Sequence, residues 1–315
     1  MKVMINSGEL SPEQIRKIEE LSDDIEVVFA KSQGDQLTEI ADTDIIFGGI
    51  SRELFLKASK LKWVHVPSAG VDGVIFPELA ESDVILTSMK GHVGVHLADH
   101  AMALLLALAR GINTALRNPG WEAQGRIRAN AIELLGKTMG IIGFGGTGFE
   151  VARRATAFGM EVIALEPEDV QKPDFVKAMW KPDKFGDLLE CSDIVTICAP
   201  LTDSTRGMFD LNAFRKMKRS AILINVTRGQ IVDGAALIQA LREGLIAAAG
   251  LDVTPQEPLP PGNPLWSMDN VIITPHTSGG SPVRVERNVK LFCDNLERFL
   301  KRKPLLSVID KLKGY

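Results

Sequence analysis

Arg228, Glu257 and His276 each lie in a loop that directly follows an expected β-strand. Parallel α/β sheets carry their functional sites at these carboxyl ends. A guanidinium fork can bind a planar carboxylate and stabilise a developing oxyanion. A carboxylate beside an imidazole favours the protonated ring, which can then act as a general acid near neutral pH. These residue types predict acid–base chemistry on a substrate that carries a carboxylate.

A glycine-rich turn lies upstream, between an expected strand at 138–142 and an expected helix at 149–158. Its sequence, Gly143-Phe144-Gly145-Gly146-Thr147-Gly148, has the pattern G-x-G-x-x-G. The first glycine forms a tight turn, the second lets the backbone approach a pyrophosphate, and the third packs the helix against the strand. The helix N-terminus then offers free N–H groups to the phosphates. The pattern predicts a dinucleotide site formed by Gly143, Gly145, Gly146, Thr147 and Gly148.

Glu166 ends the next expected strand, 18 residues after Gly148. An acid at this distance is suited to accept hydrogen bonds from an adenosine ribose. Glu166, Glu168 and Asp169 form an acidic cluster with no arginine beside it, so a ribose 2′-phosphate would meet repulsion there. We therefore expect NAD(H) to be preferred over NADP(H). The alternative is a turn without a ligand, followed by a solvated glutamate.

Structural alternatives exist for the three charged residues as well. Arg228 also suits a surface ion pair, Glu257 a solvated loop, and His276 a turn after Pro275. Their joint occurrence with the glycine-rich turn favours a functional interpretation.

Two series of short apolar runs must position these residues. Apolar runs of this length, separated by helices, indicate parallel strands that are buried on both faces. The first series predicts strands at 3–5, 25–29, 45–47, 63–66 and 84–87. The second series predicts strands at 138–142, 162–165, 194–198, 222–226, 248–253 and 271–274. Together they predict two doubly wound α/β domains.

Helices are expected between and after these strands. The segment 97–112 is apolar on nearly all sides, which predicts a helix between packed bodies. Ser11 and Gln14 predict a capping box, and Asp233 predicts the start of a helix that ends near residue 243. A last helix is expected at 281–301, whereas the polar segment 113–135 is interpreted as a connection or arm.

Composition excludes several classes of protein. At about 150 residues a domain, 315 residues favour two domains. A chain that is 45% hydrophobic and 24% charged is not disordered. A formal net charge of −4 gives no global basic field for nucleic acid or an anionic membrane. The longest apolar run, 101–109, is much shorter than the about 20 residues of a membrane span.

The three cysteines, Cys191, Cys198 and Cys293, form no CxxC pattern, and the N-terminus has no apolar run of signal-peptide length. We therefore expect reduced thiols and a cytoplasmic protein.

Five segments, in order and spacing, resemble the D-isomer-specific 2-hydroxyacid dehydrogenase family over essentially the full chain. They are the glycine-rich turn, Pro200-Leu201-Thr202 with Thr205-Arg206, the NVTRG segment at 225–229, the GLDV…EP segment at 250–258, and Pro275-His276. The resemblance implies a Rossmann NAD-binding domain at 103–283. It also implies a flavodoxin-like substrate domain, formed by 1–102 and 284–315, with the active site in the cleft between them. A homodimer is implied as well, with the 97–112 helix and the following arm at its interface.

The resemblance also implies roles for individual residues in reversible hydride transfer between NAD(H) and a small 2-oxo or 2-hydroxy acid. Arg228 would bind the carboxylate and polarise the 2-oxo group, and His276, paired with Glu257, would be the general acid and base. The loop Ser68-Ala69-Gly70-Val71 would receive the substrate carboxylate on its backbone N–H groups. Further cofactor contacts would be Cys198, Ala199, Pro200, Thr205, Val226, Thr227, Asp252 and His276.

Some positions depart from the family pattern, and others indicate whether the substrate is phosphorylated. The usual asparagine after the substrate loop is Ser88 here, and the usual glutamate before a histidine is Asp99. The loop at 47–51 has no cation except Arg52 at its edge, which argues against a phosphorylated substrate unless Lys90 supplies the charge. His92, His96 and His100 are four residues apart, but no acidic partner completes a zinc pattern, so we expect no metal site.

Three alternatives remain open at this point. The first is a formate dehydrogenase. These relatives have glutamine where this chain has Glu257, five residues after Asp252, which argues against this alternative, but a shift of one position would place Gln256 there. Phosphite dehydrogenases share the Arg, Glu and His set. The third alternative is a non-enzymatic protein that senses NAD(H).

Overall fold

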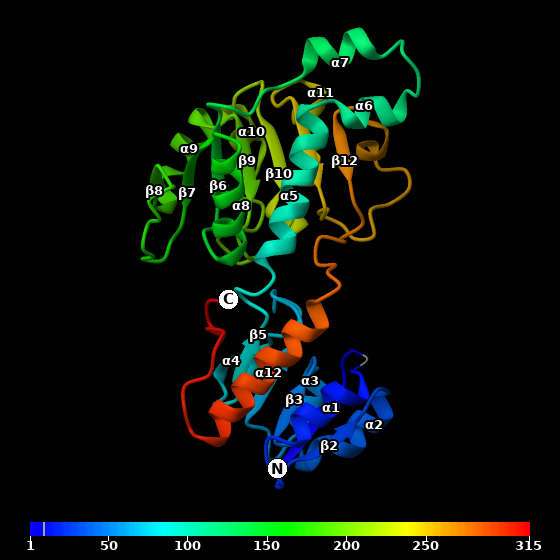
Figure 1. The fold of residues 1–315 in the computed structure, drawn as a ribbon, viewed down its shortest axis with the longest axis vertical. Coiled ribbons are helices and arrows are strands. Elements are labelled where there is room, and N and C mark those ends of the chain that lie inside the picture. The colour runs from blue at the N-terminus through cyan, green and yellow to red at the C-terminus, as the bar shows by residue number, and fades with distance from the viewer. Residues whose placement is uncertain (9) are drawn as a thin grey trace. The chain divides into compact units, whose positions relative to one another are not determined.

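The computed structural model describes residues 1–8 and 10–315, which form two compact units (Figure 1). The first unit contains Met1–Val93 and Ser281–Tyr315, and the second contains Gly94–Gly280. The domain boundaries expected from the sequence lie instead after residues 102 and 283. The first of those positions falls inside helix α5 (Gly94–Ala109), all of which belongs to the second unit.

The first unit is a five-stranded parallel sheet with the order β2-β1-β3-β4-β5. This is the flavodoxin-like order, in which ligands bind outside the carboxyl ends of the strands. Its strands are β1 (Lys2–Ile5), β2 (Glu26–Phe29), β3 (Ile45–Phe47), β4 (Trp63–Val66) and β5 (Ile85–Ser88). Its helices are α1 (Pro12–Glu19), α2 (Gln33–Glu39), α3 (Arg52–Lys57), α4 (Pro77–Glu81) and α12 (Arg284–Leu300), with a 3₁₀ turn η1 (Ile40–Asp42). The capping box between Ser11 and Gln14 is confirmed.

The second unit is a seven-stranded parallel sheet with the order β12-β11-β10-β9-β6-β7-β8. Read from β8, this is the Rossmann order with one additional strand, β12, at the far edge. Its strands are β6 (Thr138–Ile142), β7 (Glu161–Leu165), β8 (Ala178–Trp180), β9 (Ile194–Ile197), β10 (Ile222–Asn225), β11 (Ala248–Leu251) and β12 (Val271–Ile273). Its helices are α5, α6 (Ile112–Arg117), α7 (Gln124–Asn130), α8 (Gly146–Ala157), α9 (Phe185–Cys191), α10 (Leu211–Lys216) and α11 (Gly234–Arg242), with 3₁₀ turns η2 (Pro182–Lys184), η3 (Gly229–Ile231) and η4 (Pro264–Ser267).

Two elements differ from the sequence-based expectation. Strand β8 was not predicted, because it is a three-residue edge strand, only partly buried, between two lysines. The arm at 113–135 contains helices α6 and α7, which bury none of their residues and therefore show no apolar periodicity.

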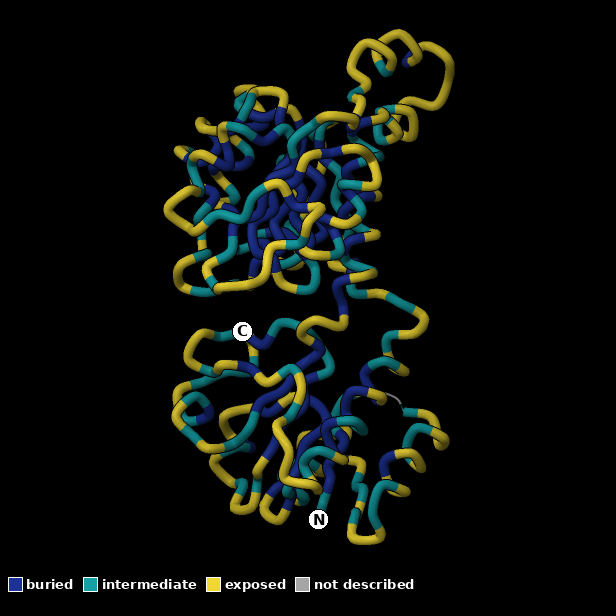
Figure 2. Tube along the Cα trace, turned by 60° about the vertical axis from the view of Figure 1, so that its left-hand side comes forward, coloured by how far each residue is buried: buried dark blue, intermediate teal, exposed yellow. Residues whose placement is uncertain are grey.

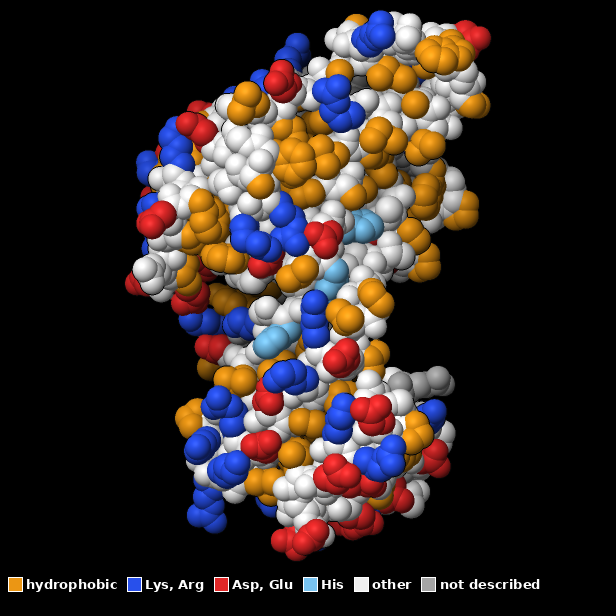
Figure 3. All heavy atoms as spheres, viewed as in Figure 1, with side chains coloured by type: hydrophobic (Ala, Val, Ile, Leu, Met, Phe, Trp, Pro, Cys, Tyr) orange, Lys and Arg blue, Asp and Glu red, His pale blue; other side chains and the backbone are white. Residues whose placement is uncertain are grey.

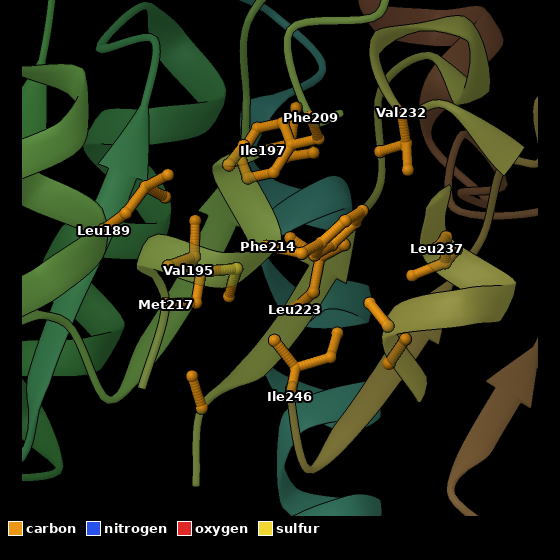
Figure 4. Packing of buried hydrophobic residues seen from close by; sticks show 14 of the residues in the cluster. Leu189, Val195, Ile197, Phe209, Phe214, Met217, Leu223, Val232, Leu237 and Ile246 are labelled. Atoms are coloured by element: carbon orange, nitrogen blue, oxygen red, sulfur yellow. The ribbon is translucent and has the colours of Figure 1, made fainter. Parts of the chain in front are cut away.

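The core of each unit lies on its parallel sheet, whose central strands are buried in the middle of the unit (Figure 2). On one face of the second sheet, Phe209 and Phe214 pack with Leu223 of β10 and Leu237 of α11 (Figure 4). The other face is covered by α5 and α8. Burial on both faces explains why the strands read as continuous apolar runs. In the described part of the chain, no helix is long and apolar enough to cross a membrane.

Candidate active site

The glycine-rich turn joins β6 to α8 with the geometry that a pyrophosphate requires. Gly143 has φ +88°, and a Cβ there would lie 2.7 Å from the Cα of Ala199. A Cβ on Gly148 would lie 2.2 Å from the carbonyl oxygen of Gly143, so these two glycines are fixed by packing. A Cβ on Gly145 would meet nothing within 4 Å, and no side chain caps the N-terminus of α8. The turn therefore leaves open space and free N–H groups where phosphates would bind.

Glu166, directly after β7, faces this turn. Its carboxylate accepts hydrogen bonds from the backbone N–H of Phe144 at 2.7 Å and of Glu168 at 3.1 Å. These bonds orient an acceptor beside the glycine-rich turn, as the sequence spacing predicted. The residues present therefore fit a dinucleotide.

Lys181 lies in the same region and was missed by the sequence analysis. Its ammonium group donates to the carboxylate of Asp169 at 2.7 Å and to the carbonyl oxygens of Pro167 and Glu168, both at 2.9 Å. The hydrogen bond from Lys181 to the carboxylate holds the pKa of Asp169 below its ordinary value. The acidic cluster therefore has a lysine beside it, which the β7–β8 pairing brings there from a position 12 residues away.

The neighbouring loop after β9 carries four more of the predicted cofactor contacts. Cys198 and Ala199 are buried against Gly143, and burial raises the pKa of the Cys198 thiol far above its ordinary value. The hydroxyl of Thr205 donates to the carbonyl oxygen of Pro200 at 2.7 Å, which closes the loop. These residues shape the backbone next to the glycine-rich turn.

Arg228 is half-buried in the loop after β10. Its backbone carbonyl accepts from Asn225, and its guanidinium donates to the carbonyl oxygen of Thr227 at 2.8 Å. A Cβ on the adjacent Gly229 would lie 1.9 Å from the carbonyl oxygen of Thr254, so glycine lets this loop contact the loop after β11. The predicted arginine is thereby brought next to the loop that contains Glu257.

Glu257 and His276 form the pair that the sequence predicted. The Nδ1 atom of His276 lies 2.7 Å from Oε2 of Glu257, whose Oε1 accepts from the backbone N–H of Thr254 at 2.9 Å. Because a carboxylate only accepts, Nδ1 carries the hydrogen and Nε2 remains for a substrate. The adjacent Gln256 contributes its backbone carbonyl oxygen, which accepts from the Thr254 hydroxyl at 2.7 Å. About half of the His276 side chain is exposed, as a group that exchanges protons with a ligand requires.

Asp252 is buried at the end of β11 and organises the loop that carries His276. Its carboxylate accepts from the backbone N–H groups of Thr277 at 2.8 Å and Ser278 at 2.9 Å, and from the Thr274 hydroxyl at 2.6 Å. Burial raises the pKa of Asp252, but these hydrogen bonds outweigh it and hold the pKa below its ordinary value. The backbone N–H of His276 donates to the carbonyl oxygens of Asp252 and Thr274, with His276 at φ +52°.

In the first unit, the loop Ser68-Ala69-Gly70-Val71 follows β4. Its carbonyl groups are held: Ser68 accepts from the Met89 N–H at 2.9 Å, and Ala69 accepts from the Ser88 hydroxyl at 3.2 Å. Its four N–H groups make no hydrogen bond with the described residues. Free N–H groups on consecutive residues are suited to bind an anion.

The family comparison agrees with this geometry. The model for the NAD binding domain of D-isomer specific 2-hydroxyacid dehydrogenases matches residues 102–278. The chain belongs to this family. It is 37% identical to a glyoxylate reductase of Korarchaeum cryptofilum, over 79% of this chain and 76% of that protein. It is also 31% identical to a D-3-phosphoglycerate dehydrogenase of Methanocaldococcus jannaschii, over 98% of this chain but only 59% of that longer protein.

The comparison with solved structures extends over both units of the chain. One of these structures is the NADPH-dependent glyoxylate/hydroxypyruvate reductase of Sinorhizobium meliloti in complex with NADP and sulfate, with a TM-score of 0.84 and 27% identity over 100% of this chain and 99% of that chain. The predicted family and the predicted two-domain α/β fold are confirmed. As a member of the 2-hydroxyacid dehydrogenases, the protein is an oxidoreductase with an NAD-binding domain that acts on CH–OH groups.

The spacing of His92, His96 and His100 raises the question of a metal site. Among the described residues, no group of three or more His, Cys, Asp or Glu side chains could hold a metal ion. His100 instead contacts Thr274 and Asp252, both of which belong to the same unit.

Proposed function

We propose that the protein is an NAD-dependent D-2-hydroxyacid dehydrogenase that reduces a small, unphosphorylated 2-oxo acid. The observation that carries this proposal is the 2.7 Å contact between His276 and Glu257. It lies on loops that also contact the loop of Arg228, at the carboxyl edge of a sheet with a dinucleotide turn. When bound, the nicotinamide cofactor supplies or accepts the hydride.

Arg228 has the role of binding the substrate and polarising it. A guanidinium binds a carboxylate through two parallel hydrogen bonds, and its charge stabilises the alkoxide that develops when the 2-oxo carbon accepts a hydride. In the first unit, the free N–H groups at 68–71 support a second contact with the substrate carboxylate.

His276 supplies the proton. Protonated His276 donates its Nε2 hydrogen to the 2-oxo oxygen as the carbon gains the hydride, so the C=O bond becomes CH–OH. The neutral ring then accepts a proton from solvent. Glu257 keeps Nδ1–H oriented and stabilises the positive charge of the ring. In the reverse direction, neutral His276 accepts the hydroxyl proton.

The charges of the first unit favour an unphosphorylated substrate. Arg52, near the loop after β3, pairs with Glu78 at 2.8 Å. The ammonium group of Lys90 lies 5.4 Å from the centre of the Tyr315 ring. The two cations that could bind a substrate phosphate, Arg52 and Lys90, therefore each contact another side chain. This supports glyoxylate, hydroxypyruvate or pyruvate over 3-phosphohydroxypyruvate.

Glu166 supports a preference for NAD(H). Its carboxylate lies beside the glycine-rich turn, where a 2′-phosphate would be repelled. Lys181 offers little attraction to a 2′-phosphate, because its ammonium group already donates to the carboxylate of Asp169. We expect Glu166→Ala to lower the ratio of kcat/KM for NADH over NADPH by about tenfold, whereas Asp169→Asn, further along the loop, should lower it less. Equal ratios in wild type and Glu166→Ala would contradict this role.

We also propose a cytoplasmic homodimer. The segment with α6 and α7 exposes Ile112, Leu116 and Trp121, the last two at 78% and 84%. Hydrophobic side chains are visible on the surface at this end of the second unit (Figure 3). Large exposed apolar side chains in one segment favour an interface. The three cysteines are free thiols, which suits a reducing compartment. Sedimentation velocity of wild type and Trp121→Glu tests the dimer, and cell fractionation tests the location.

The deciding experiment follows NADH oxidation with a panel of 2-oxo acids. Each acid is assayed with NADH and with NADPH, and the product is resolved by chiral chromatography. The panel contains glyoxylate, hydroxypyruvate, pyruvate, phenylpyruvate, branched-chain oxo acids and 3-phosphohydroxypyruvate. Turnover of a small member to the D-alcohol is the expected result. Preference for the phosphorylated member would overturn the substrate class. Inactivity on the whole panel, with activity on phosphite, would overturn the reaction.

A further inference from the structure

We propose that His100 is a positioning residue, which holds the loop of His276 in place through Thr274 and Asp252. His100 lies on α5, far from this loop in the sequence, and its side chain is 22% exposed. Its Nε2 atom lies 2.8 Å from the hydroxyl of Thr274 and 3.4 Å from Oδ1 of Asp252. All of these residues belong to the second unit.

The direction of the hydrogen bonds follows from the chemistry of the groups. The carboxylate of Asp252 only accepts, so the hydroxyl hydrogen of Thr274 points to Asp252, at 2.6 Å. The oxygen of Thr274 must then accept from His100, which therefore carries a hydrogen on Nε2. The result is a directed chain from His100 through Thr274 to Asp252.

Asp252, which accepts from Thr274, also contacts the loop of His276. Its two carboxylate oxygens accept from the N–H groups of Thr277 and Ser278, which follow His276 in the sequence. Thr274, which precedes His276, is held by the same carboxylate through its hydroxyl. His276 has φ +52°, a region that is unfavourable for a non-glycine residue, so its conformation depends on these neighbours.

Gly250 explains how α5 reaches this site. A Cβ on Gly250 would lie 2.9 Å from the Cβ of Leu104, which is one turn after His100 on α5. Only glycine therefore lets α5 approach β11 this closely. Asp252 lies two residues after Gly250, which brings the carboxylate within reach of His100.

Two matched pairs of variants test the proposal. His100→Gln places an amide donor near the position of Nε2, whereas His100→Leu removes the donor at similar size. Thr274→Ser keeps the hydroxyl, whereas Thr274→Val removes it. We expect His100→Leu and Thr274→Val to lower kcat by about 10-fold to 100-fold, because a small displacement of a catalytic group has effects of this size. His100→Gln and Thr274→Ser should stay within about threefold of wild type.

The role of His100 in catalysis rests on the proposed function, so a second measurement is independent of any substrate. Hydrogen–deuterium exchange of the protein without ligand reports on the N–H groups of Thr277 and Ser278. We expect faster exchange there in His100→Leu and Thr274→Val, and unchanged exchange in His100→Gln and Thr274→Ser. Asp99→Asn, which alters the adjacent contact of α5 with Arg154, should leave this exchange unchanged.

The outcomes are separable. If wild type turns over no 2-oxo acid, the proposed function fails, while exchange at Thr277 and Ser278 still decides the positioning role. Wild-type exchange in His100→Leu would overturn the proposal, as would equal losses of kcat in His100→Leu and His100→Gln. Where His100→Leu does not fold, His100→Asn replaces it, because the shorter asparagine amide does not reach Thr274; equal behaviour of the Asn and Gln variants would again overturn the proposal.

Discussion

The carboxyl edges of the two sheets are built differently. In the second unit, buried or partly buried carboxylates fix the loops: Asp252 accepts from Thr277 and Ser278, and Glu257 accepts from Thr254. In the first unit, the loop after β4 is held through its carbonyl groups, and its N–H groups make no hydrogen bond with the residues that the structure describes. On the proposed function, the second unit therefore fixes the side chains that would react, whereas the first unit offers backbone donors. Substitutions in the second unit should change kcat, and those in the first should change KM or stability.

The largest effect is expected for His276→Gln in the second unit. Glutamine has a similar reach but cannot donate a proton as an acid, so the reduction loses its general acid. We expect kcat to fall about 10³-fold, within the range that general acid catalysis contributes. Steady-state kinetics with the preferred 2-oxo acid measures this, and NADH binding followed by fluorescence should stay unchanged. A kcat near that of wild type would assign the proton to another group.

Arg228 should give the next largest effect. If Arg228 binds the carboxylate and stabilises the developing oxyanion, as proposed, Arg228→Ala should lower kcat by about 10²-fold to 10³-fold and raise KM as well. Arg228→Lys keeps the charge without the planar fork, so its loss should be intermediate. Kinetics of both variants checks the order. If the lysine variant matched wild type, a point charge would suffice and the proposed bidentate contact would be wrong.

From the sequence, the positions of the charged loop residues in the second unit could be predicted better than the contacts that support them. Arg228, Glu257 and His276 could be identified because each follows a continuous apolar strand, and the glycine-rich turn has a local pattern. Lys181 and His100 could not, because their partners lie on other elements and are reached only through strand pairing or the approach of α5 to Gly250. The expected domain boundaries differ from the limits of the two units by a few residues, because the apolar run 101–109 belongs to a helix that begins earlier, at Gly94, among polar residues.

The first unit contains a buried histidine that should make its stability depend on pH. His65 in β4 is fully buried, with its ring nitrogens 2.8 Å from the Thr87 hydroxyl and 2.8 Å from the amide oxygen of Asn288. Burial lowers the pKa of His65 to about 4; the hydrogen bond to Asn288 opposes this shift and His92 adds to it.

The sign of the effect follows from this lowered pKa. The unfolded chain binds the proton at an ordinary pKa of about 6.5, before the folded chain does, so stability is lost as the pH falls from about 6.5 towards 4. We expect about 2 kcal/mol less unfolding free energy at pH 5 than at pH 7 from this residue. Urea unfolding at both pH values, followed by tryptophan fluorescence, measures it. His65→Gln should lose this part of the pH dependence; an unchanged pH dependence would exclude His65 as its source.

Ser88→Ala should have the smallest effect and tests the comparison most directly. The hydroxyl of Ser88 donates to the carbonyl oxygen of Ala69, so its removal loosens the substrate loop without touching the loops of the second unit. The variant loses this hydrogen bond and the one that the hydroxyl accepts from the backbone N–H of Lys90 at 3.0 Å, and it should raise the KM for the 2-oxo acid about fivefold and leave kcat unchanged. Ser307→Ala is the matched control, because its hydroxyl bonds the carbonyl oxygen of Lys90 in the neighbouring segment and not the substrate loop. A lower kcat in Ser88→Ala alone would mean that the first unit also helps to align the reacting groups, and the division between reacting side chains and backbone donors would then be too simple.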